Sequence, residues 1–433
     1  MLLTSILTLD TNEIIKNMNK RKLVFASGVA NAFEWYDYAL FGYFAPIIGA
    51  KFFPGSSPSS SLLHAFLVFA IGYLMRPIGG VFFGVLGDRF GRKTALSTSI
   101  FCMSLPTALI GILPTYDNIG VIATILMILL RMLQGLSMGG VLTGSIAFAI
   151  EHTGKVHRGF TGSIPMSSIC LGILFGSVIS QLIQNLLSAQ QFNDWGWRIP
   201  FLVGIFILFA GLYIKKYTSE TPSFQSIKED GGILKSPLKK VISVYWIDML
   251  ISIFINSTGS VIFYLQATYL MSFLRINRGF TDDQVSNLAN YCYIIMAIVT
   301  LCSGYLSDVI GRKKIFVINL LVIILVIPFL MNVIETGEFC FIIISQIVLS
   351  ILAACYIGPE PALQAEFYPT NIRNTALSLS YNTATSIFGG TTPLILEYLV
   401  QKTGTITSSI YYVIACAISS LIALCFYKDR SRG

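Results

Sequence analysis

The stretch Gly84-Val-Leu-Gly-Asp88-Arg-Phe-Gly91-Arg92-Lys93 occurs a second time as Gly304-Tyr-Leu-Ser-Asp308-Val-Ile-Gly311-Arg312-Lys313. Every matched pair is 220 residues apart in the chain. Glycine permits tight turns and close backbone approach, and parallel internal repeats are a known plan for membrane transporters. The repeat therefore predicts two equivalent halves, each with a tight turn after its second helix.

The composition around this repeat is that of a membrane protein. The 433 residues are 54% hydrophobic and only 12% charged, with a mean hydropathy of +0.73, whereas soluble domains are about 25% charged. An apolar stretch of about 20 residues can cross a bilayer. Such stretches lie at 22–50, 62–86, 94–113, 119–149, 160–187, 197–215, 241–274, 287–308, 315–334, 338–360, 374–400 and 408–427. The sequence thus predicts an all-α polytopic membrane protein with twelve transmembrane helices in two pseudo-symmetric six-helix bundles.

The spans also define the predicted domains and the orientation of the chain. The domains are an N-terminal tail, a first bundle, a linker, a second bundle and a C-terminal tail, at 1–21, 22–215, 216–240, 241–427 and 428–433. Of the 29 Lys and Arg residues, 22 fall on the side of the termini and the linker. Because cytoplasmic loops collect Lys and Arg, both termini are predicted to be cytoplasmic. This placement explains the net charge of +8 without nucleic-acid binding.

The sequence lacks the patterns of enzymes and metal sites. The eight cysteines occur singly in apolar spans, and the three histidines lie at loop edges without metal-ligand spacing. A nucleophile triad, a phosphate-binding loop and a signalling domain are also missing from the sequence. We therefore expect no enzyme activity, no metal and no cofactor, which leaves a transporter or a membrane sensor without net transport.

The G-x-x-x-D-R-x-G-R-K turn resembles the signature of the major facilitator superfamily, and the resemblance covers the whole chain. Three further segments resemble its metabolite:H+ symporter family: Asn31-Ala-Phe-Glu34-Trp35-Tyr36-Asp37-Tyr38, Met75-Arg76-Pro77-Ile-Gly79-Gly80 and Gly196-Trp197-Arg198-Ile-Pro200-Phe201. Members include proline/betaine, 2-oxoglutarate, citrate and shikimate symporters. The resemblance implies a monomer in the bacterial inner membrane that takes up a small carboxylate metabolite with protons by alternating access. Its expected partners are that substrate, protons and the lipid bilayer.

Gating is expected at the two repeated turns. The predicted gating residues are Gly84, Asp88, Arg89, Gly91, Arg92, Gly304, Asp308, Gly311 and Arg312. Asp88 would latch to Arg89 and Arg92, and Asp308 to Arg312, although the second copy has Val309 in place of the first arginine. Further gate candidates are the acids and bases Glu151, Arg158, Glu366 and Arg373, of which the last two are expected to pair, and the segment Gly358-Pro359-Glu360-Pro361.

Four ionisable residues lie deep within the predicted spans of the first half: Glu34, Asp37, Arg76 and Arg131. A charge near the bilayer centre costs from about 2.5 to more than 10 kcal/mol, so it persists only if it is paired, hydrated or functional. Glu34 and Asp37 are three residues apart and share a helical face. Arg131 matches the superfamily's R-x-x-Q-G motif, and the resemblance implies that it couples to protons, with Asp37 or Glu34 as its partner. The alternative is an ion-pair network that only fixes helix packing.

Arg76 has a different expected role, because its planar guanidinium can hold a carboxylate with two hydrogen bonds; a structural pair with Glu34 is the alternative. Aromatic rings near the two acids could cage a quaternary ammonium by cation–π attraction, which favours a zwitterion such as proline or betaine. A dicarboxylate or oxo acid held by Arg76 and Arg198 is the alternative. The predicted cavity residues besides Arg76 are Trp35, Tyr38, Tyr264, Asn256, Gln266 and Asn382.

Overall fold

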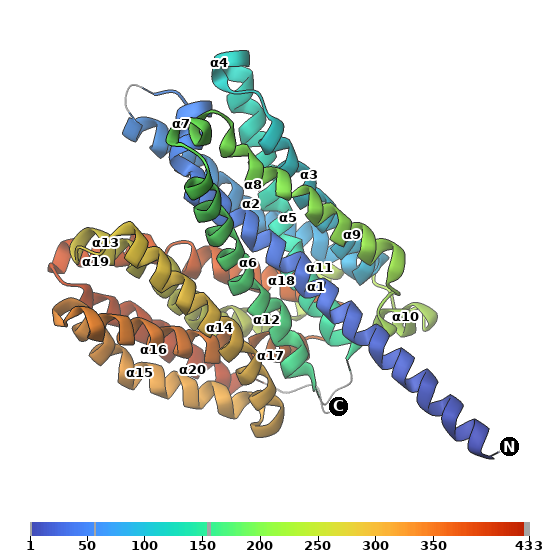
Figure 1. Cartoon of the computed structure of the whole chain (residues 1–433). Coiled ribbons are helices and arrows are strands. Elements are labelled where there is room, and N and C mark those ends of the chain that lie inside the picture. The colour runs from blue at the N-terminus through green and yellow to red at the C-terminus, as the bar shows by residue number, and fades with distance from the viewer. Residues whose placement is uncertain (1, 56–57, 154–156, 428–433) are drawn as a thin grey trace.

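The computed structural model describes the backbone of residues 2–55, 58–153 and 157–427, and within these ranges it is helical with no strand (Figure 1). The first half comprises α1 (Leu2–Phe52), α2 (Pro58–Phe90), α3 (Arg92–Ile112), α4 (Tyr116–Ile119), α5 (Val121–His152), α6 (Arg158–Leu186), α7 (Ala189–Gln191), the π-helical η2 (Phe192–Gly196), α8 (Arg198–Val203) and α9 (Ile205–Tyr217). Two short helices follow in the predicted linker, α10 (Pro222–Glu229) and α11 (Pro237–Val244).

The second half contains α12 (Trp246–Tyr264), the π-helical η3 (Leu265–Tyr269), α13 (Leu270–Asn277), α14 (Asp282–Ile310), α15 (Arg312–Thr336), α16 (Phe339–Ile357), α17 (Glu360–Phe367), α18 (Arg373–Ala384), the π-helical η4 (Thr385–Gly389), α19 (Thr392–Thr403), the 3-10 turn η5 (Ile406–Ser408) and α20 (Ser409–Phe426). The predicted N-terminal tail is helical from Leu2 and forms the first part of α1. The predicted C-terminal tail, 428–433, lies outside the described residues.

Ten helices of the described chain are long and apolar enough to cross a membrane. They cover every predicted span except the first and the eleventh. The first span lies inside α1, and the eleventh is divided among α18, η4 and α19. Together these helices give the predicted all-α membrane fold.

Three predicted spans of the second half are interrupted near their middles or ends. One is remodelled by η3, one breaks at residues 358–359 between α16 and α17, and one contains η4 and a turn at residues 390–391. Single π-helical turns are frequent at functional sites, and broken helices form the binding sites of many transporters.

The two repeated turns have the same backbone conformation. Gly91 links α2 to α3 with φ +109° and ψ 149°, and Gly311 links α14 to α15 with φ +103° and ψ 141°. Only glycine adopts such a positive φ without steric strain. The duplication seen in the sequence is therefore also present in the geometry of the chain.

Helices α2 and α5 approach so closely that two glycines of α5 lie directly against the backbone of α2. A Cβ on Gly135 would overlap the carbonyl of Gly72, and a Cβ on Gly139 would overlap the carbonyl of Arg76. Small residues at helix crossings allow such contact in membranes. This crossing fixes the backbone of the helix that carries Arg76.

The two halves meet along two pairs of helices. α2 packs against α18, and α6 packs along α14. Figure 1 shows the blue-to-green and yellow-to-red bundles lying against each other along these helices. Residues of the two halves that are more than 130 positions apart in sequence therefore become neighbours.

We expect Gly135→Ala to lower the thermal unfolding midpoint of the purified protein by several degrees. The added methyl group collides with the backbone of α2, and overpacking a tight contact costs about 1–3 kcal/mol. Gly144→Ala on the same helix is the control, because its Cβ would meet only the Leu96 side chain at 3.8 Å. Equal midpoints for the two variants would contradict the close crossing.

Candidate functional site

The four charges predicted inside the membrane are all buried in the first half. Glu34 and Asp37 lie on α1, Arg76 on α2 and Arg131 on α5, with exposed fractions of 0%, 1%, 0% and 5%. They form two groups that differ in how well their charges are compensated.

Asp37 and Arg131 form a buried, hydrogen-bonded ion pair. Arg131 Nη1 donates to Asp37 Oδ2 at 3.2 Å and to Gln134 Oε1 at 2.6 Å. Gln134 Nε2 in turn donates to Asp37 Oδ1 and to Thr107 Oγ1, both at 2.8 Å. The guanidinium also lies 3.7 Å from the centre of the Phe41 ring. Of the two partners predicted for Arg131, the structure shows Asp37.

Gln134 is a site residue that the sequence interpretation quoted only as part of a motif. It lies three positions after Arg131, so both side chains project from one face of α5. Its amide contacts the acid and the base at once, which orients both groups. The helical spacing of the R-x-x-Q-G motif is the signal that could have identified it.

Glu34 and Arg76 are buried, and their charged groups lack hydrogen bonds within the part of the chain that the structure describes. Neither carboxylate oxygen of Glu34 and none of the three guanidinium nitrogens of Arg76 has a hydrogen-bond partner among the described residues. The charge of Arg76 acts on Glu34, but the described residues show no ion pair between them. The structural pair considered for these two residues is therefore not formed. Uncompensated buried charge is costly, so these two groups are candidates for contact with a ligand.

Aromatic rings from both halves surround Arg76. Its guanidinium lies 5.0 Å from the ring centre of Tyr73 and 5.8 Å from that of Trp35. The Tyr73 and Tyr264 hydroxyls are hydrogen-bonded across the two halves, and the Trp35 ring packs on Phe263 with centroids 5.8 Å apart. These contacts place an aromatic layer where α2 and α1 meet α12.

A cavity lies beside this layer, between the halves. Its volume is about 20 Å³, which is room for about one water molecule, so a substrate could enter only if the two halves moved apart. Its aromatic and polar lining includes Trp35, Asn256, Ser260, Phe263, Tyr264, Glu360, Tyr381 and Thr385. Glu360 was predicted only as part of a gate segment, and the structure places it in this cavity instead.

The other predicted cavity residues have varied positions. Tyr38 packs on Trp35 with ring centroids 5.2 Å apart. Asn382 donates to the carbonyls of Gly139 and Ser378, both at 2.8 Å, so it joins the halves rather than lining the cavity. Gln266 lies in η3 outside the lining, and its side-chain amide has no hydrogen-bond partner within the described ranges.

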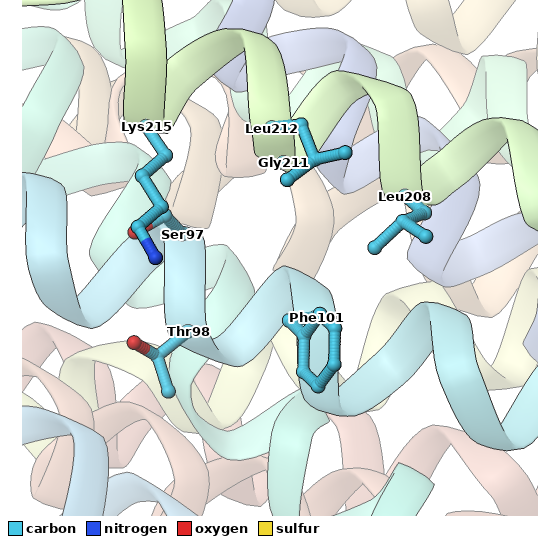
Figure 2. A pocket seen from close by; sticks show the side chains of 7 residues that line it. All are labelled: Ser97, Thr98, Phe101, Leu208, Gly211, Leu212 and Lys215. Carbon is cyan, nitrogen blue, oxygen red and sulfur yellow. The ribbon is translucent and has the colours of Figure 1, made fainter.

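A second groove lies between α3 and α9, away from the charges described above (Figure 2). Figure 2 shows Lys215 reaching toward Ser97 at one end and leucines facing Phe101 at the other. The groove is mainly apolar, with none of the predicted site residues in its lining. It lacks the convergent polar groups expected of a site for a polar substrate.

The repeated aspartates cap helices of the opposite half. Asp88 accepts hydrogen bonds from the backbone N–H groups of residues 374–375, at 3.2 and 2.8 Å, where α18 begins. Asp308 accepts from those of residues 159–160, at 2.8 and 2.9 Å, where α6 begins. The first N–H groups of a helix have no partner within it, and the helix dipole favours an anion there. We call the end of the molecule that holds these contacts the turn end.

Ion pairs reinforce the first of these caps. Arg92 Nη2 lies 3.1 Å from Asp88 Oδ1, and Arg92 Nε lies 3.1 Å from Glu151 Oε2. Arg373 from the second half approaches the other oxygen of Glu151 at 3.1 Å. Glu151 therefore joins a cation of its own half to a cation of the other half.

The second cap has the equivalent arrangement. Arg312 Nη1 lies 2.6 Å from Asp308 Oδ1, and Arg312 Nε lies 3.2 Å from Glu366 Oε2. Arg158 from the first half completes the set at 4.0 Å from Glu366. The turn end is thus closed by two related networks that cross between the halves.

Two predicted gate contacts are wrong. Glu366 does not pair with Arg373, because each of them pairs with residues of the opposite half. Arg89 is exposed, stacks 5.5 Å from the Phe90 ring centre and has no ion pair with Asp88 within the described chain. Arg89 directly follows Asp88 on α2, so the two side chains leave the helix in different directions, and the second copy has Val309 at the equivalent position.

Comparison with known families identifies the chain. A family model described as Sugar (and other) transporter matches residues 23–240, and the Major Facilitator Superfamily model matches residues 249–433. The chain belongs to the major facilitator superfamily. It is therefore an integral membrane protein of a transporter family, as the sequence resemblance predicted.

Relatives of this chain include proteins named as proline/betaine transporters. The chain is 33% identical to the proline/betaine transporter of Escherichia coli, over 98% of this chain and 87% of that one. It is 32% identical to the glycine betaine/proline/ectoine/pipecolic acid transporter OusA of Dickeya dadantii, over 98% and 86%.

Solved structures share the superfamily fold. The proton:xylose symporter XylE matches with a TM-score of 0.80 at 18% identity, covering 96% of this chain and 97% of that one. FucP in its outward conformation matches with a TM-score of 0.68 at 16% identity, covering 93% and 98%.

We expect Glu151→Gln to weaken the contacts between the two halves at the turn end. Removing one partner of a buried ion pair costs about 3–5 kcal/mol, and the substitution leaves Arg92 and Arg373 without their shared anion. The measurement is maleimide labelling of Thr143→Cys, a buried position bonded to Ser378 across the halves, in a chain without other cysteines. Labelling should accelerate at least fivefold.

The matched control is Asp282→Asn, which removes an exposed pair with Arg275 at 2.7 Å. Such surface pairs contribute about 0–1 kcal/mol, so its labelling rate should stay at the parent value. A Glu151→Gln rate equal to that of the control would show that the network does not hold the turn end closed.

Proposed function

We propose that this chain is a secondary active transporter that takes up proline, betaine or a similar zwitterion together with protons. The observation that carries the proposal is Arg76, a buried guanidinium without a hydrogen-bond partner in the described chain, beside aromatic rings and a cavity between the halves. The names of the relatives, which include proline/betaine transporters, support the same substrate class.

Arg76 is the group that would receive the substrate carboxylate. A guanidinium binds a carboxylate with two parallel, charge-assisted hydrogen bonds, and this one has its donors free. The rings of Trp35 and Tyr264 line the cavity, where their faces can attract a quaternary or secondary ammonium. The carboxylate of the substrate would therefore contact Arg76, and its ammonium group would contact the aromatic rings.

Proton coupling is assigned to Asp37 with Arg131. A proton and a guanidinium compete for the same carboxylate charge, because protonation of Asp37 removes the attraction for Arg131. Release of Arg131, transmitted through Gln134, would then change how α1 and α5 pack. Glu34 is one helical turn away and lacks a direct partner within the described chain, so it is the second candidate for the coupled proton.

Alternating access would use the two networks at the turn end. Parallel-repeat transporters rock one half against the other around a central site. In the described structure both networks are formed, which corresponds to closure at the turn end. Opening requires that Asp88 and Asp308 leave the helix starts of the opposite half.

The orientation and assembly follow from the same proposal. We place the turn end and both termini in the cytoplasm of a bacterial inner membrane, because 22 of the 29 Lys and Arg residues fall on that side. The moving bodies are the bundles 22–215 and 241–427, joined by 216–240. All residues that line the cavity come from one chain, which supports a monomer, and the cycle needs no covalent chemistry.

One observation weighs against a dicarboxylate as the substrate. Arg198, the second cation that such a substrate would need, donates to the carbonyls of Gly111 at 3.1 Å and Leu113 at 2.7 Å. It also stacks on the Trp197 ring. Its donors are used far from Arg76 in the fold, between α3 and α8.

The test of the function is uptake of labelled betaine, proline, 2-oxoglutarate, citrate and shikimate into proteoliposomes with an alkaline interior. We expect gradient-driven accumulation of betaine or proline. Accumulation of an oxo acid or tricarboxylate instead would overturn the substrate class. Accumulation of none would favour the sensor that keeps the fold without transport.

Arg76→Gln should raise the KM for betaine or proline by about 10- to 100-fold, because hydrogen bonds to a charged group contribute about 1.5–3 kcal/mol. Arg89→Gln is the control, since it removes the same charge from an exposed position of the same helix. Equal KM values in the two variants would show that Arg76 does not bind substrate.

Asp37→Asn should abolish accumulation driven by a pH gradient while leaving exchange of labelled for unlabelled substrate at least half as fast. The amide cannot carry the proton, but the binding cavity is intact. Asp117→Asn, an exposed acid on α4, should behave as the parent. Normal gradient-driven accumulation in Asp37→Asn, with loss in Glu34→Gln, would move the coupling role to Glu34.

A further inference from the structure

Glu360 is a buried carboxylate that the transport cycle described above does not use. It is 2% exposed and begins α17, directly after the break between α16 and α17. The break at residues 358–359 interrupts the regular hydrogen bonding of the span, because proline cannot donate a backbone hydrogen bond. The carboxylate therefore enters the cavity between the halves instead of facing lipid.

No cation compensates Glu360 within the described chain. No Lys, Arg or His side chain of the described chain forms an ion pair with Glu360, and its hydrogen bond comes from the Gln364 amide at 3.3 Å. The nearby acid Glu366 belongs to the turn-end network, six residues further along α17. Burying a charged carboxylate away from water costs free energy unless its charge is compensated. A cationic ligand at this position would supply that compensation.

The cavity wall around Glu360 suits an ammonium group. The rings of Trp35, Phe263, Tyr264 and Tyr381 share the lining with it, and ring faces attract cations. Two further lining atoms, Asn256 Nδ2 and Thr385 Oγ1, are buried without hydrogen-bond partners in the described ranges. Several polar groups in this wall therefore have unused hydrogen-bonding capacity within the described chain.

Arg76 and Glu360 give the site opposite charges in the two halves. Arg76 lies on α2, and Glu360 lies on α17. Arg76 is not itself part of the cavity lining, but its guanidinium lies 5.8 Å from the ring centre of Trp35, which shares the lining with Glu360. A ligand beside Trp35 would therefore be near a cation of one half and an anion of the other.

We propose that Glu360 binds the ammonium group of the substrate, so that Arg76 and Glu360 together select zwitterions. This inference rests on the proposed transport function and adds the group that determines specificity. A substrate with only carboxylates would bring a second negative charge toward Glu360, and like charges repel strongly where water is excluded. The dipolar site thus favours betaine and proline over oxo acids. The carboxylate of the substrate would contact the first half and its ammonium group the second half. One bound substrate would therefore connect the two bundles that move during transport.

The experiment compares betaine with 3,3-dimethylbutyrate, which has carbon in place of the quaternary nitrogen and therefore carries no positive charge. Binding is measured as competition against labelled betaine in proteoliposomes. The parent protein should bind betaine at least 30-fold more tightly than the carbon analogue. In Glu360→Gln this preference should fall to about threefold or less, whereas Glu360→Asp should retain most of it.

Glu338→Gln is the matched control, because it removes an exposed carboxylate from the same half; it should keep the preference of the parent. A merely structural role for Glu360 would weaken both ligands equally and leave their ratio unchanged, which would overturn the inference. Normal betaine affinity in Glu360→Gln with loss of gradient-driven accumulation would also overturn it, since Glu360 would then carry a proton.

If Glu360→Gln does not fold, competition in the parent protein decides. Tetramethylammonium, which has the cation without the carboxylate, should compete with betaine, and 3,3-dimethylbutyrate should compete weakly. The reverse order would refute an ammonium site. Failure of the parent to transport betaine or proline at all would instead count against the proposed function, so the two failures are distinguishable.

Discussion

The cost of holding charge inside a bilayer is the constraint on which the rest of this structure depends. A buried ion is stable only where hydrogen bonds and counter-charges replace water. The turn end meets this requirement, since Glu151 and Glu366 each bind cations of both halves. Asp37 and Arg131 also meet it, with Gln134. Glu34, Arg76 and Glu360 have no ion-pair partner in the described chain, and in the proposed cycle they are the groups that a ligand and protons would contact.

The two kinds of charge have different consequences for motion. In the proposed cycle, the compensated networks hold the halves together at one end and have to break. The uncompensated groups in the centre would gain their partners from substrate or protons. Ligand binding can therefore supply free energy at the centre while the end networks are being lost. The broken helices of the second half, with η3 and η4, place this exchange among backbone segments that already depart from regular α-helix.

Much of the fold and part of the site could be predicted from the sequence. Repetition around Gly91 and Gly311 indicated two equivalent turns, and both glycines have nearly the same φ. Depth within a span identified Asp37 and Arg131 as buried charges but left Glu34 open as the partner of Arg131, and the structure shows Asp37. The cross-half contacts were less predictable, because Glu151 and Arg373 are 222 positions apart and helical spacing says nothing about such pairs. Glu360 was misplaced for a related reason: the span boundary put it near a gate, whereas the break in the helix brings it into the cavity.

In the opposite half, the aspartates of the repeat accept hydrogen bonds from backbone N–H groups rather than from side chains. Asp88 caps a helix start formed by an asparagine and a threonine, whereas Asp308 caps one formed by a glycine and a phenylalanine. Any non-proline residue offers the same N–H group, so hydrogen bonding alone places little restriction on the sequence at the capped positions. Packing adds a restriction at one of them, because a Cβ at Gly159 would overlap the carbonyl oxygen of Gly304. After an ancestral duplication, the two caps could therefore keep the same hydrogen bonds while their capped residues diverged as far as the local packing allowed.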